Sequence, residues 1–351
     1  MNILLTFDYE LYGDGSGDIF KNMVEPTNKI LEILDKNSIK STIFFEVIEY
    51  WKIKEQWEKG NNMGYEKNPV KAIEDQLKNA FSNGHDVQLH LHPQWINATW
   101  NDGGWIVDNS LWRLGDFEKI NDYTLEDLIR DGKKTLVEMF TGINSHYKCH
   151  TLRAGGYNII PSNNILKVMK KLDFICESSV YPGGFEEGTL SRYDYKSIDI
   201  KKGFWYIDDD VLLERKYETG MIELPIFALP TTRIRKLLSK NRLISLLSNK
   251  KSAITSFSAK AKAEKSLFSK IAYLFRKEYL TWDFCLFSDS MHNRFLAKSL
   301  KLEKYHNRTT FSVIGHPKNY VNSASLNSII SRTQRLNVSF LTVSEFCIQT
   351  K

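Results

Sequence analysis

The sequence has few cysteines and no long apolar run. Its 351 residues include four cysteines, which are far apart and form no CxxC pair: Cys149, Cys176, Cys285 and Cys347. This spacing excludes a disulfide framework and a thiolate zinc site, and it is typical of a reducing compartment. No apolar segment approaches the roughly 20 residues that span a bilayer. The first expected strand, residues 2–7, leads directly into acidic residues, so we expect no cleavable signal and a cytoplasmic location.

The sequence also lacks a recognisable nucleic-acid reader motif, an internal repeat and a low-complexity linker. With 42% hydrophobic and 26% charged residues, its composition is that of an ordinary globular protein. The net charge of +6 is unevenly spread, because residues 231–277 hold 13 Lys/Arg and one acidic residue, Glu264. Their local charge of +12 leaves −6 for the remainder, so we expect a mildly acidic body with one strongly basic segment.

Strand and helix patterns alternate along the chain. The early strand patterns lie at residues 2–7, 41–47 and 87–92, and helix patterns lie at 27–36, with Thr27 as the candidate cap, and at 68–83, ended by Gly84. Later strand patterns cover residues 150–157, 174–179, 221–229, 311–316 and 338–343. This order predicts an α/β fold with a parallel sheet closed into a barrel, in which chemistry gathers at the carboxyl ends of the strands.

Three of the eight histidines lie in one stretch, GHDVQLHLHPQW, at residues 84–95. Side chains alternate along a strand, so His90 and His92 project from one face and the apolar side chains between them from the other. Pro93 ends strand pairing because it has no N–H to donate. Two neighbouring imidazoles at a strand end suit a divalent transition metal, although the pattern also fits two histidines on a solvated face. His85, outside this row, is assigned to the structural histidines.

Polar residues follow four of the expected strands: Asp8 and Glu10, His90 and His92, Arg153, and His316. One carboxylate with two histidines is a common ligand set for a catalytic zinc-like ion that keeps a position open for water. A second carboxylate can take the proton of that water, a separate histidine can protonate the leaving group, and an arginine can keep the base ionised. Taken singly, each residue also fits an ordinary role, such as a surface ion pair or a structural histidine.

Residues 95–117 are rich in tryptophan, with Gly103 and Gly104 between Trp100 and Trp105. A core helix would not carry a glycine pair there, so this segment is predicted to be a loop. Flat rings on such a loop suit stacking on a sugar face, and they equally suit hydrophobic plugs that cap the barrel. Both interpretations stay open, and the candidate substrate-binding residues are Trp95, Tyr157 and Glu177.

Five segments occur in the order LTFDYE, GHDVQLHLHP, LRAGGYN, ICESSVYPGG and VIGHPKN. Together they resemble the polysaccharide deacetylase family, the NodB-homology domain of carbohydrate esterase family four, and more narrowly its deacetylase-like branch found with bacterial surface-polysaccharide genes. The resemblance covers the chain apart from residues 231–280. It implies a distorted barrel and the removal of acetyl groups from N-acetyl amino sugars with a divalent metal, zinc first, with cobalt or nickel as alternatives.

The resemblance also implies residue roles. Asp8 matches the aspartate that acts as base, Arg153 the arginine that orients this base, and His316, followed by Pro317, the catalytic acid. A metal-binding carboxylate usually comes directly after the base in this family. That position is Tyr9 here, so the role passes to Glu10. Glu177 stands where relatives tend to have an aspartate before two serines.

The metal histidines depart from the family pattern in one place. His90 matches the first metal histidine, but the second normally comes four residues later, where this chain has Gln94. Either His92 replaces the missing histidine, or the Gln94 amide oxygen binds weakly, or the site is impaired. We prefer His92 because imidazole is much the better ligand for zinc-like ions.

The basic segment mixes Lys/Arg with Leu, Ile and Phe at three- and four-residue spacing in residues 233–247 and 260–275. This pattern predicts basic amphipathic helices, either lying on an anionic membrane surface or packed on the barrel as a lid. We expect one barrel from residues 1–230 and 281–351, with a basic helical insertion at 231–280.

The predicted function is a metal-dependent carbohydrate deacetylase of bacterial polysaccharide biosynthesis. Its substrate would be a nucleotide- or lipid-linked amino sugar, with peripheral membrane contact through residues 233–277 and no nucleic-acid partner. The alternative is a catalytically weak carbohydrate-binding or scaffold protein on the same fold.

Overall fold

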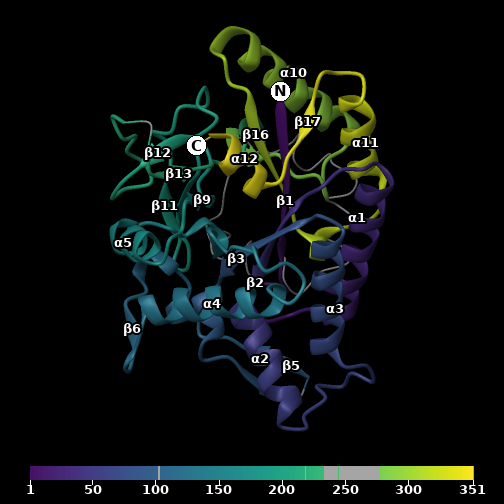
Figure 1. The fold of residues 1–351 in the computed structure, drawn as a ribbon, viewed down its shortest axis with the longest axis vertical. Coiled ribbons are helices and arrows are strands. Elements are labelled where there is room, and N and C mark those ends of the chain that lie inside the picture. The colour runs from purple at the N-terminus through teal and green to yellow at the C-terminus, as the bar shows by residue number, and fades with distance from the viewer. Residues whose placement is uncertain (102, 218, 233–243, 245–276, 351) are drawn as a thin grey trace, which may run out of the picture.

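A curled sheet of nine strands forms the centre of a mixed α/β fold, with helices packed around it (Figure 1). The computed structural model describes residues 1–101, 103–217, 219–232, 244 and 277–350. The strands follow the order β12-β13-β9-β8-β3-β2-β1-β16, and β17 also pairs with β1. Their bounds are β1 Asn2–Tyr9, β2 Thr42–Glu46, β3 Asp86–Leu91, β8 Thr151–Ala154, β9 Cys176–Glu177, β12 Trp205–Ile207, β13 Met221–Glu223, β16 Thr310–Gly315 and β17 Ser339–Phe340.

The predicted parallel sheet is confirmed, because every pair in it is parallel except β12 with β13. Its two margins meet at isolated bridges. Ile226, shortly after β13, pairs with Ser312 of β16, and Asp283 pairs with Ile314 of the same strand. The expected barrel is therefore a curled half-barrel sheet whose margins meet at these bridges.

Helices connect the parallel strands, as crossover connections require. In Figure 1, α1, α3 and α11 run along one side of the view, and α2 and α4 lie below the sheet. The bounds are α1 Glu25–Lys36, α2 Val47–Glu58, α3 Pro69–Ser82, α4 Leu125–Phe140, α5 Asn163–Lys171, α10 Asp289–His306, α11 Ala324–Thr333 and α12 Val343–Thr350. The Asn68 side chain caps α3 ahead of Pro69, and Thr124 with Asp127 forms a capping box on α4.

The inner face of the curled sheet is apolar at one end and polar at the other. Near the amino end of β1, Leu4 belongs to a separate small core that includes Phe346 of α12 and Phe44, which lies in register with Asp8. The amide of Val343 donates to Thr42 Oγ1 at 2.8 Å, which holds α12 against this end. Because alternate residues share a face, the strand that places Leu4 inward also points Asp8 inward, at the opposite end.

Several expected elements have other bounds in the structure. Thr27 is not a helix cap, because α1 starts at Glu25, directly after a π-helical turn at Ile19–Val24. Thr27 lies inside α1 and is fully buried. The helical patterns of α2, α10 and α12 were missed. Between the expected strands at 174–179 and 221–229, the structure contains the hairpin β10 Phe185–Glu187 with β11 Arg192–Asp194.

The tryptophan-rich segment is a loop with short elements, as expected: β4 Thr99–Asn101, β5 Gly104–Ile106 and two short 3₁₀ turns. The short hairpin strands β6 Lys119–Ile120 and β7 Tyr123–Thr124 follow it. The ends of the expected basic insertion pair as an antiparallel ribbon, β14 Ala228–Thr232 with β15 Lys277–Thr281. The two predicted basic helices lie outside the described residues. Across the described residues, none of the helices combines the length and the apolar character that crossing a bilayer requires.

Candidate active site

Strand β1 points two carboxylates to the inside of the sheet because a tyrosine separates them. Asp8 and Glu10 share one face, while Tyr9 points into the outer core and donates to Gln76 Oε1 at 2.6 Å. The strand is extended through Tyr9, so both carboxylates lie at the carboxyl end of the sheet. Because Tyr9 stands between the two carboxylates, Glu10 lies on the same face of the strand as Asp8.

Strand β3 and the residue directly after it supply two imidazoles, His90 and His92, whose rings lie 4.9 Å apart. His90 Nδ1 is 2.9 Å from the carbonyl oxygen of Arg153, which can only accept, so the neutral ring carries its proton on Nδ1 and its lone pair on Nε2. His92 Nδ1 lies 2.8 Å from the Gln94 amide nitrogen. Both Nε2 atoms point to Glu10: its Oε2 is 3.3 Å from His90 Nε2 and 2.7 Å from His92 Nε2.

These three residues fit a divalent metal ion. Glu10, His90 and His92 are buried, and one ligand atom from each lies within 4.8 Å of the others. Among the described residues, neither histidine Nε2 has a hydrogen-bond partner, although both are buried. Two buried imidazole nitrogens directed at one carboxylate oxygen are the donor set of a zinc-like site. Asp8, Glu10 and His316 form an overlapping second group.

Asp8 is held by a buried arginine from β8. Arg153 Nη1 donates to Asp8 Oδ1 at 2.7 Å, while its Nη2 donates to Thr6 Oγ1 at 3.0 Å and its Nε to the Ser178 carbonyl at 2.8 Å. The guanidinium stacks 3.8 Å over the Phe44 ring. Burial alone would raise the pKa of Asp8, but Arg153 and the neighbouring histidines hold it well below its usual range.

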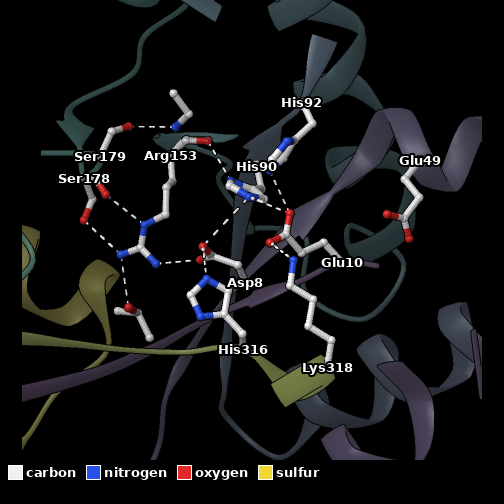
Figure 2. A network of polar contacts seen from close by, with 12 residues as sticks. Asp8, Glu10, Glu49, His90, His92, Arg153, Ser178, Ser179, His316 and Lys318 are labelled. Atoms are coloured by element: carbon white, nitrogen blue, oxygen red, sulfur yellow. Dashed lines mark hydrogen bonds and ion pairs between the residues drawn. The ribbon is translucent and has the colours of Figure 1, made fainter. Parts of the chain in front are cut away.

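His316 follows β16 and lies on the other side of Asp8. Its Nε2 is 3.5 Å from Asp8 Oδ2, and its Nδ1 is 3.8 Å from Asp283 Oδ2. Figure 2 shows Asp8, Glu10, His90 and His316 pointing toward one another from β1, β3 and β16. Burial lowers the pKa of His316, but the two carboxylates outweigh burial and raise it to about 9. The imidazole therefore carries a proton at neutral pH.

A lysine completes the electrostatics of the site. Lys318 Nζ donates to Glu10 Oε1 at 2.6 Å and to the Leu11 carbonyl at 2.8 Å, which leaves Oε2 of Glu10 for the histidines. Burial would raise the pKa of Glu10, yet Lys318 and His92 keep it well below its usual range. Burial lowers the pKa of His92. Glu10 is therefore ionised and His92 neutral at neutral pH, which are the forms that bind metal.

The remaining predicted site residues lie around this centre. Gln94 is fully buried behind His92, and Glu177 is fully buried with its Oε2 accepting from the Ser179 amide at 3.0 Å. Trp95 is 1% exposed and packs edge-on against Trp105, which favours the plug interpretation for this ring. Tyr157 is partly exposed, with φ of +63°. The substrate role of these residues stays a prediction.

Sequence reasoning missed three residues of the site. Asp283 reaches His316 only because the sheet margins meet at the Asp283 bridge, and no local motif signals this. Lys318 lies two residues after His316, a spacing that could have indicated it. Glu49 on α2 accepts a hydrogen bond from the Leu11 backbone amide with both oxygens, at 2.9 and 3.2 Å, and so fixes the chain directly after Glu10.

The overall structure is similar to solved structures of polysaccharide deacetylases and carbohydrate esterases. One is a polysaccharide deacetylase from Mycobacterium smegmatis, with 10% identity over 99% of this chain and 89% of that chain and a TM-score of 0.47. Another is the catalytic domain of a peptidoglycan N-acetylglucosamine deacetylase from Eubacterium rectale, with 12% identity over 97% and 88% and a TM-score of 0.36. A family 4 carbohydrate esterase from Bacillus anthracis has 17% identity over 49% and 56% and a TM-score of 0.27.

No protein-family model and no curated protein matches the sequence. These structural neighbours are polysaccharide deacetylases or family 4 carbohydrate esterases, the kind of protein that the sequence resemblance predicts. At identities of 10–17% they show a likeness of fold and assign no chemistry to this site.

Proposed function

We propose that this protein is a metal-dependent hydrolase that removes an acetyl, or related acyl, group from an amino sugar. One observation carries the proposal: the buried donor set of Glu10, His90 and His92 lies beside an ionised carboxylate, Asp8, and a protonated imidazole, His316. A base, an acid and a metal site within one cluster are the requirements of amide hydrolysis. The scaffold alternative gives no reason for this convergence.

A divalent ion held by Glu10, His90 and His92 would supply Lewis acidity and lower the pKa of a water molecule. Asp8 is placed to take the proton of the attacking water, since its Oδ2 lies 3.9 Å from His90 Nε2, on the side of the metal ligands. Arg153 keeps Asp8 ionised and fixes its Oδ1, so that Oδ2 remains for proton transfer.

His316 is placed to act as the acid. It is protonated at neutral pH and lies on the side of Asp8 away from Arg153, where it can donate a proton to the departing amine. The Asp283 carboxylate faces its Nδ1 and stabilises the charged form. Acid and base thus differ in protonation at the same pH because their neighbours differ in charge.

The proposed substrate is an N-acetyl amino sugar on a nucleotide or lipid carrier, used in bacterial polysaccharide assembly. A cytoplasmic location and peripheral membrane contact through residues 233–277 belong to the same proposal. Of the loop tryptophans, Trp112 lies against Gly13 and Gly156, in the loops that follow Glu10 and Arg153. This partly exposed ring is the best placed to line a sugar.

The test is acetate release from N-acetylglucosamine oligosaccharides, UDP-N-acetylglucosamine and lipid-linked N-acetyl sugars by zinc-loaded protein. We expect turnover of at least one substrate, its loss with a chelator, and a decrease of about 100-fold or more in His316→Ala with metal still bound. His146, an exposed histidine before β8, is the matched control, and His146→Ala should keep full activity. Bound metal and bound sugar without any acyl release would favour the scaffold alternative.

A further inference from the structure

We infer that Gln94 and Gly155 are positioning residues that convert His92 into a metal ligand, and that Gln94 is not itself a ligand. The inference rests on the proposed metal site and explains how that site is built without a histidine at position 94. Gln94 would hold the imidazole from its Nδ1 side, and Gly155 would leave the space in which the ring lies.

The Gln94 carboxamide lies on the far side of the His92 ring from the other ligands. Its nitrogen is 2.8 Å from His92 Nδ1, whereas His92 Nε2 lies 2.7 Å from Glu10 Oε2. The short turn Pro93–Trp95 brings residue 94 back against residue 92. The backbone carbonyl of Gln94 accepts a hydrogen bond from the backbone amide of Asp108 at 3.0 Å. Gln94 is thus fixed behind His92 rather than beside Glu10.

Metal binding through Nε2 requires the His92 proton to be on Nδ1. A carboxamide can accept that proton with its oxygen, because its nitrogen and oxygen exchange places when the amide turns over. Gln94 Oε1 is buried and has no hydrogen-bond partner within the described part of the chain. Turning the amide over would give this oxygen a partner, the Nδ1–H of the metal-binding tautomer. An outer-shell acceptor of this kind fixes both the tautomer and the ring orientation of a ligand histidine.

Gly155 provides the space for the ring. A Cβ at this position would lie 2.4 Å from Cγ and Cδ2 of His92 and 2.5 Å from its Cε1, so the imidazole rests directly on the glycine backbone. Gly155 does not have a positive φ. Gly155→Ala is therefore a steric probe of the His92 ring that leaves backbone conformation unstrained.

The experiment measures zinc affinity by competition with a chromophoric chelator, with the visible spectrum of the cobalt-loaded protein as a second readout. We expect Gln94→Ala and Gly155→Ala each to weaken zinc binding about 10- to 100-fold and to change the cobalt bands. Gln94→Glu keeps an acceptor for Nδ1–H and should retain wild-type affinity. Gly142→Ala is the matched control, since nothing lies within 4 Å of a Cβ there, and it should bind zinc normally.

The decisive comparison uses the His92→Ala background. If Gln94 acts only through His92, adding Gln94→Ala to His92→Ala weakens zinc binding no further. A further loss of tenfold or more would make Gln94 an independent ligand and overturn the inference. Unchanged affinity in the single Gln94→Ala variant would also overturn it, while the proposed function would stand. A folded wild-type protein that binds neither zinc nor cobalt would overturn both.

Discussion

Arg153 Nη1 lies 2.7 Å from Asp8 Oδ1, a contact between residues separated by 145 positions in the chain. Both side chains are buried, and Nε and Nη2 of Arg153 donate to Thr6 and Ser178. Because these hydrogen bonds fix the orientation of the buried guanidinium, the guanidinium in turn fixes the orientation of the Asp8 carboxylate. The pair therefore sets both the charge and the orientation of the proposed base.

Replacing Arg153 by methionine removes the cation that keeps Asp8 ionised. The pKa of Asp8 should rise, so the base takes up a proton at higher pH and the acidic limb of the kcat/KM profile moves to higher pH. We also expect kcat to fall about 100-fold from the lost orientation. Arg130→Met, at an exposed arginine on α4, is the control and should leave the profile unchanged. An unshifted acidic limb in a folded Arg153→Met protein would contradict this assignment.

The metal site predicts stabilisation by zinc. An ion that binds the folded chain stabilises it by about 2.7 kcal/mol at 100 times its Kd, so Tm should rise by several degrees when zinc is added. His90→Ala should abolish most of this rise, because it removes one of the three proposed ligands. His146→Ala should keep it. An equal rise in the His90→Ala protein would place the stabilising zinc elsewhere on the chain.

Local sequence pattern was sufficient for the centre of this site. Strict alternation along β1 and β3 predicts that Asp8 with Glu10, and His90 with His92, share a face, and parallel strand order brings their ends together. These inferences need only the periodicity of an extended chain. The structure places all four side chains at the carboxyl end of the sheet, as that reasoning requires.

Contacts that depend on tertiary closure could not be predicted in this way. Asp283 meets His316 because the margins of the sheet join, which no local spacing records. The helix α2 was missed because its sequence, VIEYWKIKEQWE, follows a strand without a turn signal. Thr27 was misplaced because the π-helical turn before α1 moves the helix start upstream of the expected cap.

A pair of buried carboxyl groups next to Arg153 predicts a pH-dependent stability. Glu223 lies opposite Glu177 in the register of β13 and β9, and both are fully buried. Burial raises the pKa of both groups, and the Glu177 charge raises that of Glu223 further. At a pH above the ordinary pKa of a carboxyl group, the unfolded chain has therefore released protons that the pair still holds in the folded state. Stability contributed by the pair falls as pH rises.

Glu223→Gln should reduce this fall, because an amide keeps the shape of the protonated acid and cannot ionise. Urea unfolding at pH 5.5 and pH 8.5 measures the difference, and the variant should lose less free energy of unfolding between the two than the wild type. Glu187→Gln, at an exposed glutamate on β10, should behave as the wild type. Identical losses in Glu223→Gln and wild type would mean that the pair does not retain a proton in the folded state.

A buried histidine away from the site gives the opposite pH dependence. His292 on α10 accepts the Trp282 indole N–H at 3.0 Å, and its Nε2 lies 3.0 Å from Ser325 Oγ. Burial lowers its pKa to about 4, despite the carboxylates of Asp283 and Asp289. Below about pH 6.5 the unfolded chain protonates this histidine while the folded chain does not, so stability is lost as pH falls toward 4.

The loss amounts to about 3 kcal/mol when complete, since each pKa unit corresponds to about 1.4 kcal/mol. His292→Gln should be less stable than the wild type at pH 7.5, because the two hydrogen bonds are disturbed, but should lose less stability between pH 7.5 and pH 4.5. His306→Gln, at the exposed end of the same helix, should follow the wild type at both pH values. A His292→Gln protein whose stability falls with acid as steeply as that of the wild type would show that other groups cause the acid sensitivity.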